Sequence, residues 1–172
     1  MPYKRLNTDA PFGAIPYDET KRISPYNKAA GYATRIFPGD FVTLASDGNV
    51  NVAAAGDRLL GVAAEDSAAS TAKTDFMVYD HPDQLFTAQA DDGGTALAQT
   101  NVGNNCDILA TAGDTTTSRS LHEIDQSTAG TGTAQVKLVA LDPIEAGTFG
   151  ANRKYVFRIA EHIYGSGSES GV

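Results

Sequence analysis

Short apolar or alternating runs fill the chain from Tyr32 onward, and Gly, Asn, Asp, Ser and Pro separate them. This spacing is typical of strands joined by turns. We expect strands at residues 32–37, 41–45, 50–53, 59–64, 75–79, 85–90, 106–110, 119–124, 135–141 and 153–163. So dense a succession of short strands predicts an all-β fold, a compact β-barrel domain over residues 32–164.

Turn and loop residues divide this domain. Asp47-Gly48 lies between two apolar runs, and this dipeptide tolerates the positive φ angles of a type I′ turn, so we expect a hairpin there. Residues 91–105 and 126–133 are rich in Gly, Thr and Asn and are expected to be loops. No helical period is sustained, which predicts one short helix at most. Residues 165–172 are expected to form a flexible tail.

Residues 1–31 follow neither the strand period nor the helix period, and they hold four of the seven prolines. Repeated proline removes backbone donors and blocks helix, which predicts an extended N-terminal arm. The arm carries bulky side chains that disordered tails usually lack, and such groups usually pack on something. Two arrangements stay open. The arm joins a neighbouring subunit by strand addition, or it folds back across its own domain and covers a sheet edge.

Charge is uneven along the chain. The formal net charge is −8, yet residues 1–31 carry five basic and three acidic side chains, so the remainder carries −10. An acidic body repels phosphate backbones, which argues against nucleic acid as a partner. The chain also lacks a long apolar run and a signal-like N-terminal stretch, so we expect a soluble protein without a membrane partner. A lone cysteine and three histidines exclude disulfide scaffolds and common zinc modules.

Few residues offer catalytic chemistry. Asp80, His81 and Asp83 lie close together, but Asp and Pro after a strand are typical of a turn. His122 and Glu123 lie in a predicted strand, where adjacent side chains point to opposite faces. We therefore expect no enzyme, no cofactor and no metal site, and the composition favours a binding role. A small hydrolase that uses the Asp80 turn is the enzymatic alternative.

One stretch resembles a known family. It comprises Phe37-Pro38-Gly39-Asp40-Phe41-Val42-Thr43-Leu44, then Gly48-Asn49-Val50, then Gly56-Asp57-Arg58-Leu59-Leu60-Gly61-Val62-Ala63. It is similar to the capsid decoration (cement) proteins of tailed bacteriophages, in which a Pro-Gly-Asp strand, an Asp-Gly turn and a Gly-Val-Ala strand follow a proline-containing arm. The resemblance covers residues 1–65 in motif terms.

The resemblance implies a β-tulip-like barrel on the outer capsid surface, bound to the major capsid protein as a homotrimer or a homodimer, and stabilising the virion. We expect the arm to make this contact, through Tyr3, Lys4, Arg5, Leu6, Phe12, Arg22 and Tyr26. Removal of residues 1–31 should then abolish attachment without unfolding the body. The alternative function is a β-rich module that binds carbohydrate or a host surface.

Overall fold

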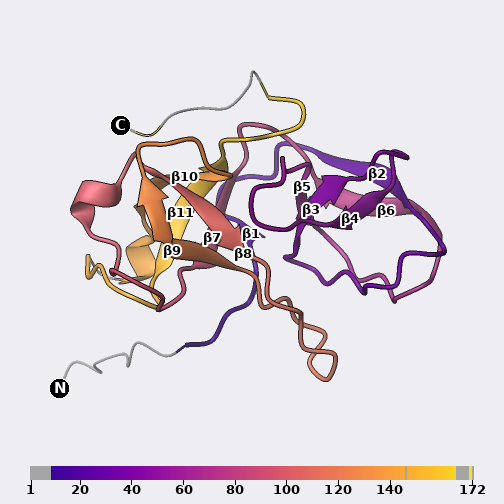
Figure 1. Ribbon diagram of the computed structural model, residues 1–172, viewed down its shortest axis with the longest axis horizontal. Coiled ribbons are helices and arrows are strands. Elements are labelled where there is room, and N and C mark those ends of the chain that lie inside the picture. Colours follow the sequence, from indigo (N-terminus) through magenta and orange to yellow (C-terminus); the bar gives the residue numbers. More distant parts are fainter. Residues whose placement is uncertain (1–8, 146, 166–170, 172) are drawn as a thin grey trace.

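The computed structural model describes residues 9–145, 147–165 and 171, which form two antiparallel sheets side by side (Figure 1). The six-stranded sheet has the order β1-β7-β11-β10-β8-β9, and the five-stranded sheet has the order β2-β6-β5-β3-β4. Two short 3-10 turns lie at Gln99–Asn101 and Pro143–Glu145. The strands are β1 (Ile15–Pro16), β2 (Ile23–Lys28), β3 (Phe41–Leu44), β4 (Val50–Val52), β5 (Gly61–Ala63), β6 (Lys73–Tyr79), β7 (Leu85–Gln89), β8 (Asn105–Leu109), β9 (Glu123–Gly130), β10 (Val136–Leu141) and β11 (Lys154–Ile159). The predicted all-β class and barrel-like body are confirmed.

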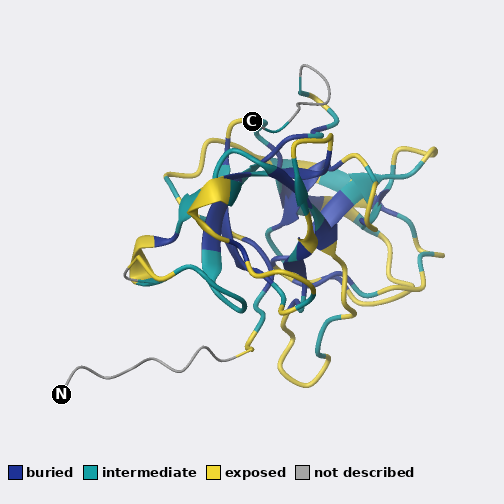
Figure 2. Ribbon diagram, turned by 60° about the vertical axis from the view of Figure 1, so that its left-hand side comes forward, coloured by how far each residue is buried: buried dark blue, intermediate teal, exposed yellow. Residues whose placement is uncertain are grey.

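The central strands of the five-stranded sheet carry apolar side chains on both faces, and one of these faces packs against the six-stranded sheet. Neighbouring residues along a strand point to opposite faces. Phe41 and Val62 belong to one apolar cluster with the six-stranded sheet, whereas Val42 and Ala63 belong to a second cluster on the far face. The Phe41 ring lies 5.7 Å from the Phe157 ring of β11. The continuous buried layer that results is visible in Figure 2.

The six-stranded sheet curls until β9, at one edge, reaches the end of β7, the strand next to the other edge. Ala90, just after β7, forms a parallel bridge with Ile124 in β9, and the Asp91 N–H donates to the Ile124 carbonyl over 3.0 Å. This contact covers part of the free edge of β9, because it gives the Ile124 backbone on that edge a hydrogen-bond partner. Closure of this kind gives the sheet its barrel-like form.

The N-terminal residues are built into both sheets. Ile15 pairs with Thr87 in β7, and β2 pairs antiparallel with β6 from Ile23 opposite Tyr79 to Lys28 opposite Lys73. Residues 15–28, which we call the N-terminal strap, thus run antiparallel to residues 73–87 across both sheets. Residues 9–31 therefore fold back across their own domain and cover a sheet edge, which is one of the two arrangements considered from the sequence. They do not form an arm separate from the body. Pro16 and Pro25 are tolerated because β1 and β2 are edge strands.

Several boundaries differ from those predicted. The hairpin between β3 and β4 is confirmed, but only Gly48 has a positive φ (77°), and the Gly48 N–H donates to Ala45. The turn is therefore a type I turn followed by a left-handed glycine, instead of type I′. Residues 126–133 are not all loop, since β9 continues to Gly130 opposite Asn105. Residues 32–37 contribute only one bridge, between Ile36 and Ser67.

The last strand is shorter than predicted. β11 ends at Ile159, although the alternating pattern continues to Ile163. His162 then forms a parallel bridge with Leu59, and the Ile163 N–H donates to the Leu59 carbonyl. After Ile159 the chain leaves the six-stranded sheet and bonds to Leu59, just before β5 of the other sheet. The first part of the alternating pattern therefore belongs to one sheet, and the last part contacts the other.

Candidate functional site

The seven residues predicted to bind a partner fall into two groups. Tyr3, Lys4, Arg5 and Leu6 lie outside the described residues. Phe12, Arg22 and Tyr26 are described, and all three contact the body of the same chain. The Lys154 ammonium lies 4.7 Å from the centre of the Phe12 ring. Arg22 and Tyr26 both bond to Asp80. These three side chains therefore help to hold the strap in place.

Asp80 is the anchor of the strap. It is only 2% exposed, and its carboxylate accepts hydrogen bonds from Arg22 Nε over 2.8 Å and from Tyr26 Oη over 2.6 Å. Burial by itself would raise the pKa of Asp80, but the bonds from Arg22 and Tyr26 hold it below its ordinary value. Burial and the bond to Asp80 raise the pKa of Tyr26. The carboxylate thus stays ionised and joins β2 to the end of β6.

Other side chains of the strap point outward. Exposure alternates along the strap, with Ile15, Tyr17, Ile23 and Pro25 exposed and their neighbours Pro16, Ser24 and Tyr26 half-buried. Ile15 is 47% exposed. We call the set Ile15, Tyr17 and Ile23 the outward apolar row. The backbone pairing with β6 and β7 fixes the places of these residues, so the row presents three exposed apolar side chains along the strap.

The part of the N-terminal segment that the structure describes carries no net charge. Residues 9–31 contain as many basic side chains as acidic ones: Lys21, Arg22 and Lys28 against Asp9, Asp18 and Glu19. Lys28 is moreover buried, and its ammonium donates to the carbonyls of Ala68 and Thr71. The basic excess of residues 1–31 therefore comes from Lys4 and Arg5.

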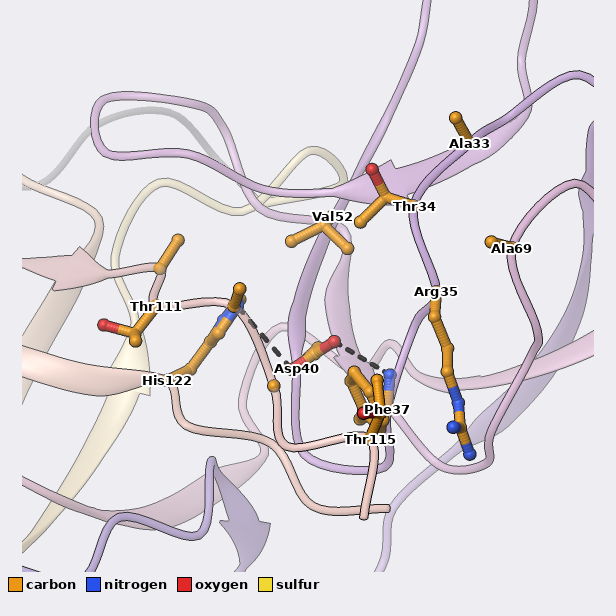
Figure 3. A pocket seen from close by; sticks show the side chains of 13 residues that line it. Ala33, Thr34, Arg35, Phe37, Asp40, Val52, Ala69, Thr111, Thr115 and His122 are labelled. Atoms are coloured by element: carbon orange, nitrogen blue, oxygen red, sulfur yellow. Dashed lines mark hydrogen bonds and ion pairs between the residues drawn. The ribbon is translucent and has the colours of Figure 1, made fainter. Parts of the chain in front are cut away.

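A cavity of about 490 Å³ lies between residues 33–40 and residues 110–115. Thr34, Arg35 and Thr115 supply polar groups to its wall, and Figure 3 shows Asp40 and His122 facing each other inside it. The Arg35 guanidinium is already bound to Asp66 and Ser118. Gly113 packs so closely on the Phe37 ring that an added Cβ would lie 2.3 Å from it. The cavity has a mixed lining and a buried polar base.

The Asp40–His122 pair forms that base. His122 Nδ1 accepts a hydrogen bond from the Phe41 N–H over 3.1 Å, which places the ring proton on Nε2, 3.6 Å from Asp40 Oδ1. Ser120 Oγ accepts from the His122 N–H. The resulting Ser, His and Asp set is not arranged as a nucleophilic triad, because the nitrogen that would take the serine proton is occupied by the backbone. It joins β3 to the start of β9 through polar contacts.

The titration of this pair is testable. Burial lowers the pKa of His122 from 6.5 to about 4 and raises the pKa of Asp40 from 3.8 to about 6. The unfolded chain therefore takes up the His122 proton first, so the His122 contribution to stability is lost as pH falls from 6.5 to 4. For Asp40 the sign is opposite, and stability is lost as pH rises from 3.8 to 6. We expect NMR titration to find His122 neutral at pH 5.5. A His122 midpoint near 6.5 would contradict its burial.

The other residues that the sequence analysis considered for catalysis make contacts within the fold, as far as the structure describes them. In the turn after β6, His81 Nδ1 accepts from the Asp83 N–H, while Asp80 is held by the strap. Cys106 lies in the core, and burial raises the pKa of its thiol to about 12. Among the described residues, no set of three His, Cys, Asp or Glu side chains could hold a metal ion. In the same part of the chain, no helix is long and apolar enough to cross a membrane.

The sequence did not indicate two features of this site. Asp40 and His122 lie far apart in the chain, and neither residue has a local motif that predicts their contact. The outward apolar row was visible only as bulky side chains in a proline-rich segment. Comparison of the chain with models of protein families, with curated proteins and with solved structures found no match.

Proposed function

We propose that this chain is a structural protein of a virion, which decorates and stabilises a bacteriophage capsid. It would bind the major capsid protein on the outer surface of the shell, as a homotrimer or a homodimer, without catalysing a reaction. The observation that carries the proposal is the outward apolar row, which the strap presents as a fixed surface on the edges of both sheets.

The segments that resemble decoration proteins are also adjacent in space. They form β3, the hairpin turn, β4 and β5, which are neighbours in one sheet. The Pro38-Gly39 turn contacts the residues just before the strap, because the Ala14 N–H donates to the Gly39 carbonyl over 2.9 Å. The motif residues thus support the N-terminal segment, which is consistent with a shared role of the two.

The physical properties of the strap suit attachment. Apolar side chains at the centre of an interface contribute most of its binding free energy. The strap backbone is already ordered, so binding would cost little conformational entropy. Residues 9–31, which include the outward apolar row, are neutral overall, whereas residues 32–172 are acidic, and Lys4 and Arg5 add positive charge for an acidic capsid surface. Two or three such attachments in one oligomer would multiply weak contacts.

Co-sedimentation with undecorated capsids tests this function. We expect Ile15→Asp/Ile23→Asp to reduce the apparent affinity by more than about tenfold, since two charges would enter an apolar interface. Ile144→Asp is the matched control, because Ile144 is 49% exposed and lies outside the strap. Equal binding by the strap variant and the control would reject the outward apolar row as the attachment surface. Failure of the unmodified chain to bind would reject decoration itself.

A second candidate is a module that binds carbohydrate or a host surface. The cavity beside Arg35 favours it, because threonine hydroxyls and small apolar side chains line a space of about 490 Å³. Sites for small ligands combine such a lining with a few polar groups. A glycan array discriminates between the two functions: a specific hit that Thr34→Val abolishes would support the module, and no hit would count against it.

A further inference from the structure

We propose that the cavity beside Arg35 takes a neutral compound with several hydroxyl groups, one of which bonds to both Asp40 and His122. The inference rests on the second candidate function, a module that binds carbohydrate. To that function it adds the chemical class of the ligand and the two residues that select it. It does not depend on attachment to a capsid.

The base of the cavity holds a donor and an acceptor that are not bonded to each other. Asp40 and His122 are each only 2% exposed, and both line the cavity (Figure 3). Asp40 Oδ2 accepts from the Phe37 N–H over 2.8 Å, whereas Asp40 Oδ1 is buried without a hydrogen-bond partner among the described residues. His122 Nε2 lies 3.6 Å from this oxygen, too far for a hydrogen bond. Buried polar groups are ordinarily bonded, so the pair lacks a third group.

A hydroxyl group is the one that satisfies both atoms. Because His122 Nδ1 accepts from the Phe41 N–H, the Nε2 atom carries the ring proton and is a donor. Asp40 Oδ1 is an acceptor as long as the carboxyl is ionised. A hydroxyl oxygen can accept from Nε2 and donate to Oδ1 at the same time. An ammonium group has no lone pair for Nε2, and a carboxylate has no proton for Oδ1.

The charge of the base selects against anions. Burial raises the pKa of Asp40 to about 6, against the opposing effect of the Phe37 N–H and the Ser120 hydroxyl, and burial lowers the pKa of His122 to about 4. At a pH of about 7.5 the base is therefore a carboxylate beside a neutral imidazole. The Arg35 guanidinium is already bound to Asp66. An anionic ligand would meet a buried negative charge, and a neutral one would not.

The walls of the cavity suit a ligand with further hydroxyl groups. Thr34, Thr111 and Thr115 line the cavity and are exposed, so their hydroxyls can reach a ligand. The volume of about 490 Å³ lies in the range of small-ligand sites, about 300 to 1,000 Å³, and far exceeds the roughly 30 Å³ of one water molecule. The space therefore fits a sugar-sized compound above the base.

Contacts between the two walls hold the cavity in shape. Arg35, in one wall, donates to the Ser118 hydroxyl over 2.8 Å. Asp114 and Arg119 exchange backbone hydrogen bonds in both directions, and this pairing closes the loop that carries Thr115. A site that is ordered before the ligand arrives loses less conformational entropy on binding.

NMR titration of the full chain at a pH of about 7.5 tests the proposal. The neutral probes are glucose, galactose, mannose and N-acetylglucosamine, and glucuronate and galacturonate are the anions matched to the first two. We expect at least one neutral sugar to give saturable shifts of the Phe37 and Gly113 amides and of the His122 ring nitrogens. The matched anions should bind at least about tenfold more weakly than glucose and galactose.

Asp40→Asn tests the base, because it keeps the shape of the side chain and removes the charge. We expect it to weaken binding of the neutral sugar by at least about tenfold and to reduce the preference over the matched anion. Thr111→Val/Thr115→Val should also weaken binding, whereas Thr133→Val, at an exposed position outside the cavity, should leave it unchanged. If Asp40→Asn does not fold, the threonine variants and the matched anions still decide the matter.

The outcomes separate this inference from the function on which it rests. Sugar binding that both cavity variants leave unchanged would overturn the inference and keep the carbohydrate module, with its site elsewhere. Equal affinity for a neutral sugar and its matched anion would overturn selection by the Asp40–His122 pair. The absence of shifts with every probe would also overturn the inference, with water alone at the base, and the glycan array would then decide on the module.

Discussion

A chain that begins at Gly31 is expected to lose cooperative folding, whereas a chain that begins at Asp9 is expected to keep it. The first truncation removes β1 and β2, one edge strand from each sheet. It also removes Lys28, which is buried against the carbonyls of residues 68 and 71. The second truncation leaves the strap complete.

The contacts of Asp80 alone account for a large share of the stability that the strap provides. In the full chain with Arg22→Ala/Tyr26→Phe, the Asp80 carboxylate would stay beneath the strap and lose two of its side-chain donors, with Ser24 remaining. Removing the partner of a buried charge costs about 3 to 5 kcal/mol, and we take the lower end because half of the Arg22 side chain is solvent-exposed. Whole domains are stable by only about 5 to 15 kcal/mol. The lost edge strands add to this cost.

Thermal unfolding followed by circular dichroism, with urea unfolding as a second method, measures the difference. Arg22→Ala/Tyr26→Phe in the full chain separates the Asp80 contribution from that of the strands. A cooperative transition of ordinary midpoint in the chain from Gly31 would show that the strap is dispensable. This result would also restore the expectation that residues 1–31 can be removed without unfolding the body. The structure changes that expectation, so a binding test should use the chain from Asp9.

Substitution of Gly61 by alanine is expected to destabilise the protein by about 3 kcal/mol or more. Gly61 begins β5, where the next residue, Val62, pairs with Tyr79 in β6. A Cβ at position 61 would lie 2.1 Å from the Tyr79 carbonyl oxygen. Backbone cannot move aside as a flexible side chain can, so β5 and β6 would have to separate locally.

Gly132→Ala is the matched control, because an added Cβ at Gly132 meets nothing within 4 Å. Urea unfolding of the two variants beside the unmodified chain checks the prediction. We expect a lower midpoint for Gly61→Ala and a change within about 0.5 kcal/mol for the control. Equal stability of the two variants would mean that the approach of β5 to Tyr79 is looser than described.

The candidate site could be predicted only in part. The bulky residues of the N-terminal segment were expected to pack on something. Phe12 and Tyr26 do so, whereas Ile15, Tyr17 and Ile23 stay exposed. The partner of Tyr26 and Arg22 was not predictable, because the local sequence around Asp80 is typical of a turn. The residues of the strap that remain exposed could not be identified either, since exposure in an edge strand depends on which strand lies beside it.

The local pattern of the sequence determined the all-β class, the hairpin at Asp47-Gly48 and most strands from β3 to β11, because side-chain alternation and turn residues act over a few neighbours. Only the tertiary structure decided that the strap joins both sheets and that Asp40 meets His122. These contacts join residues distant in the chain. Each depends on how whole sheets pack, so no short stretch of sequence encodes it.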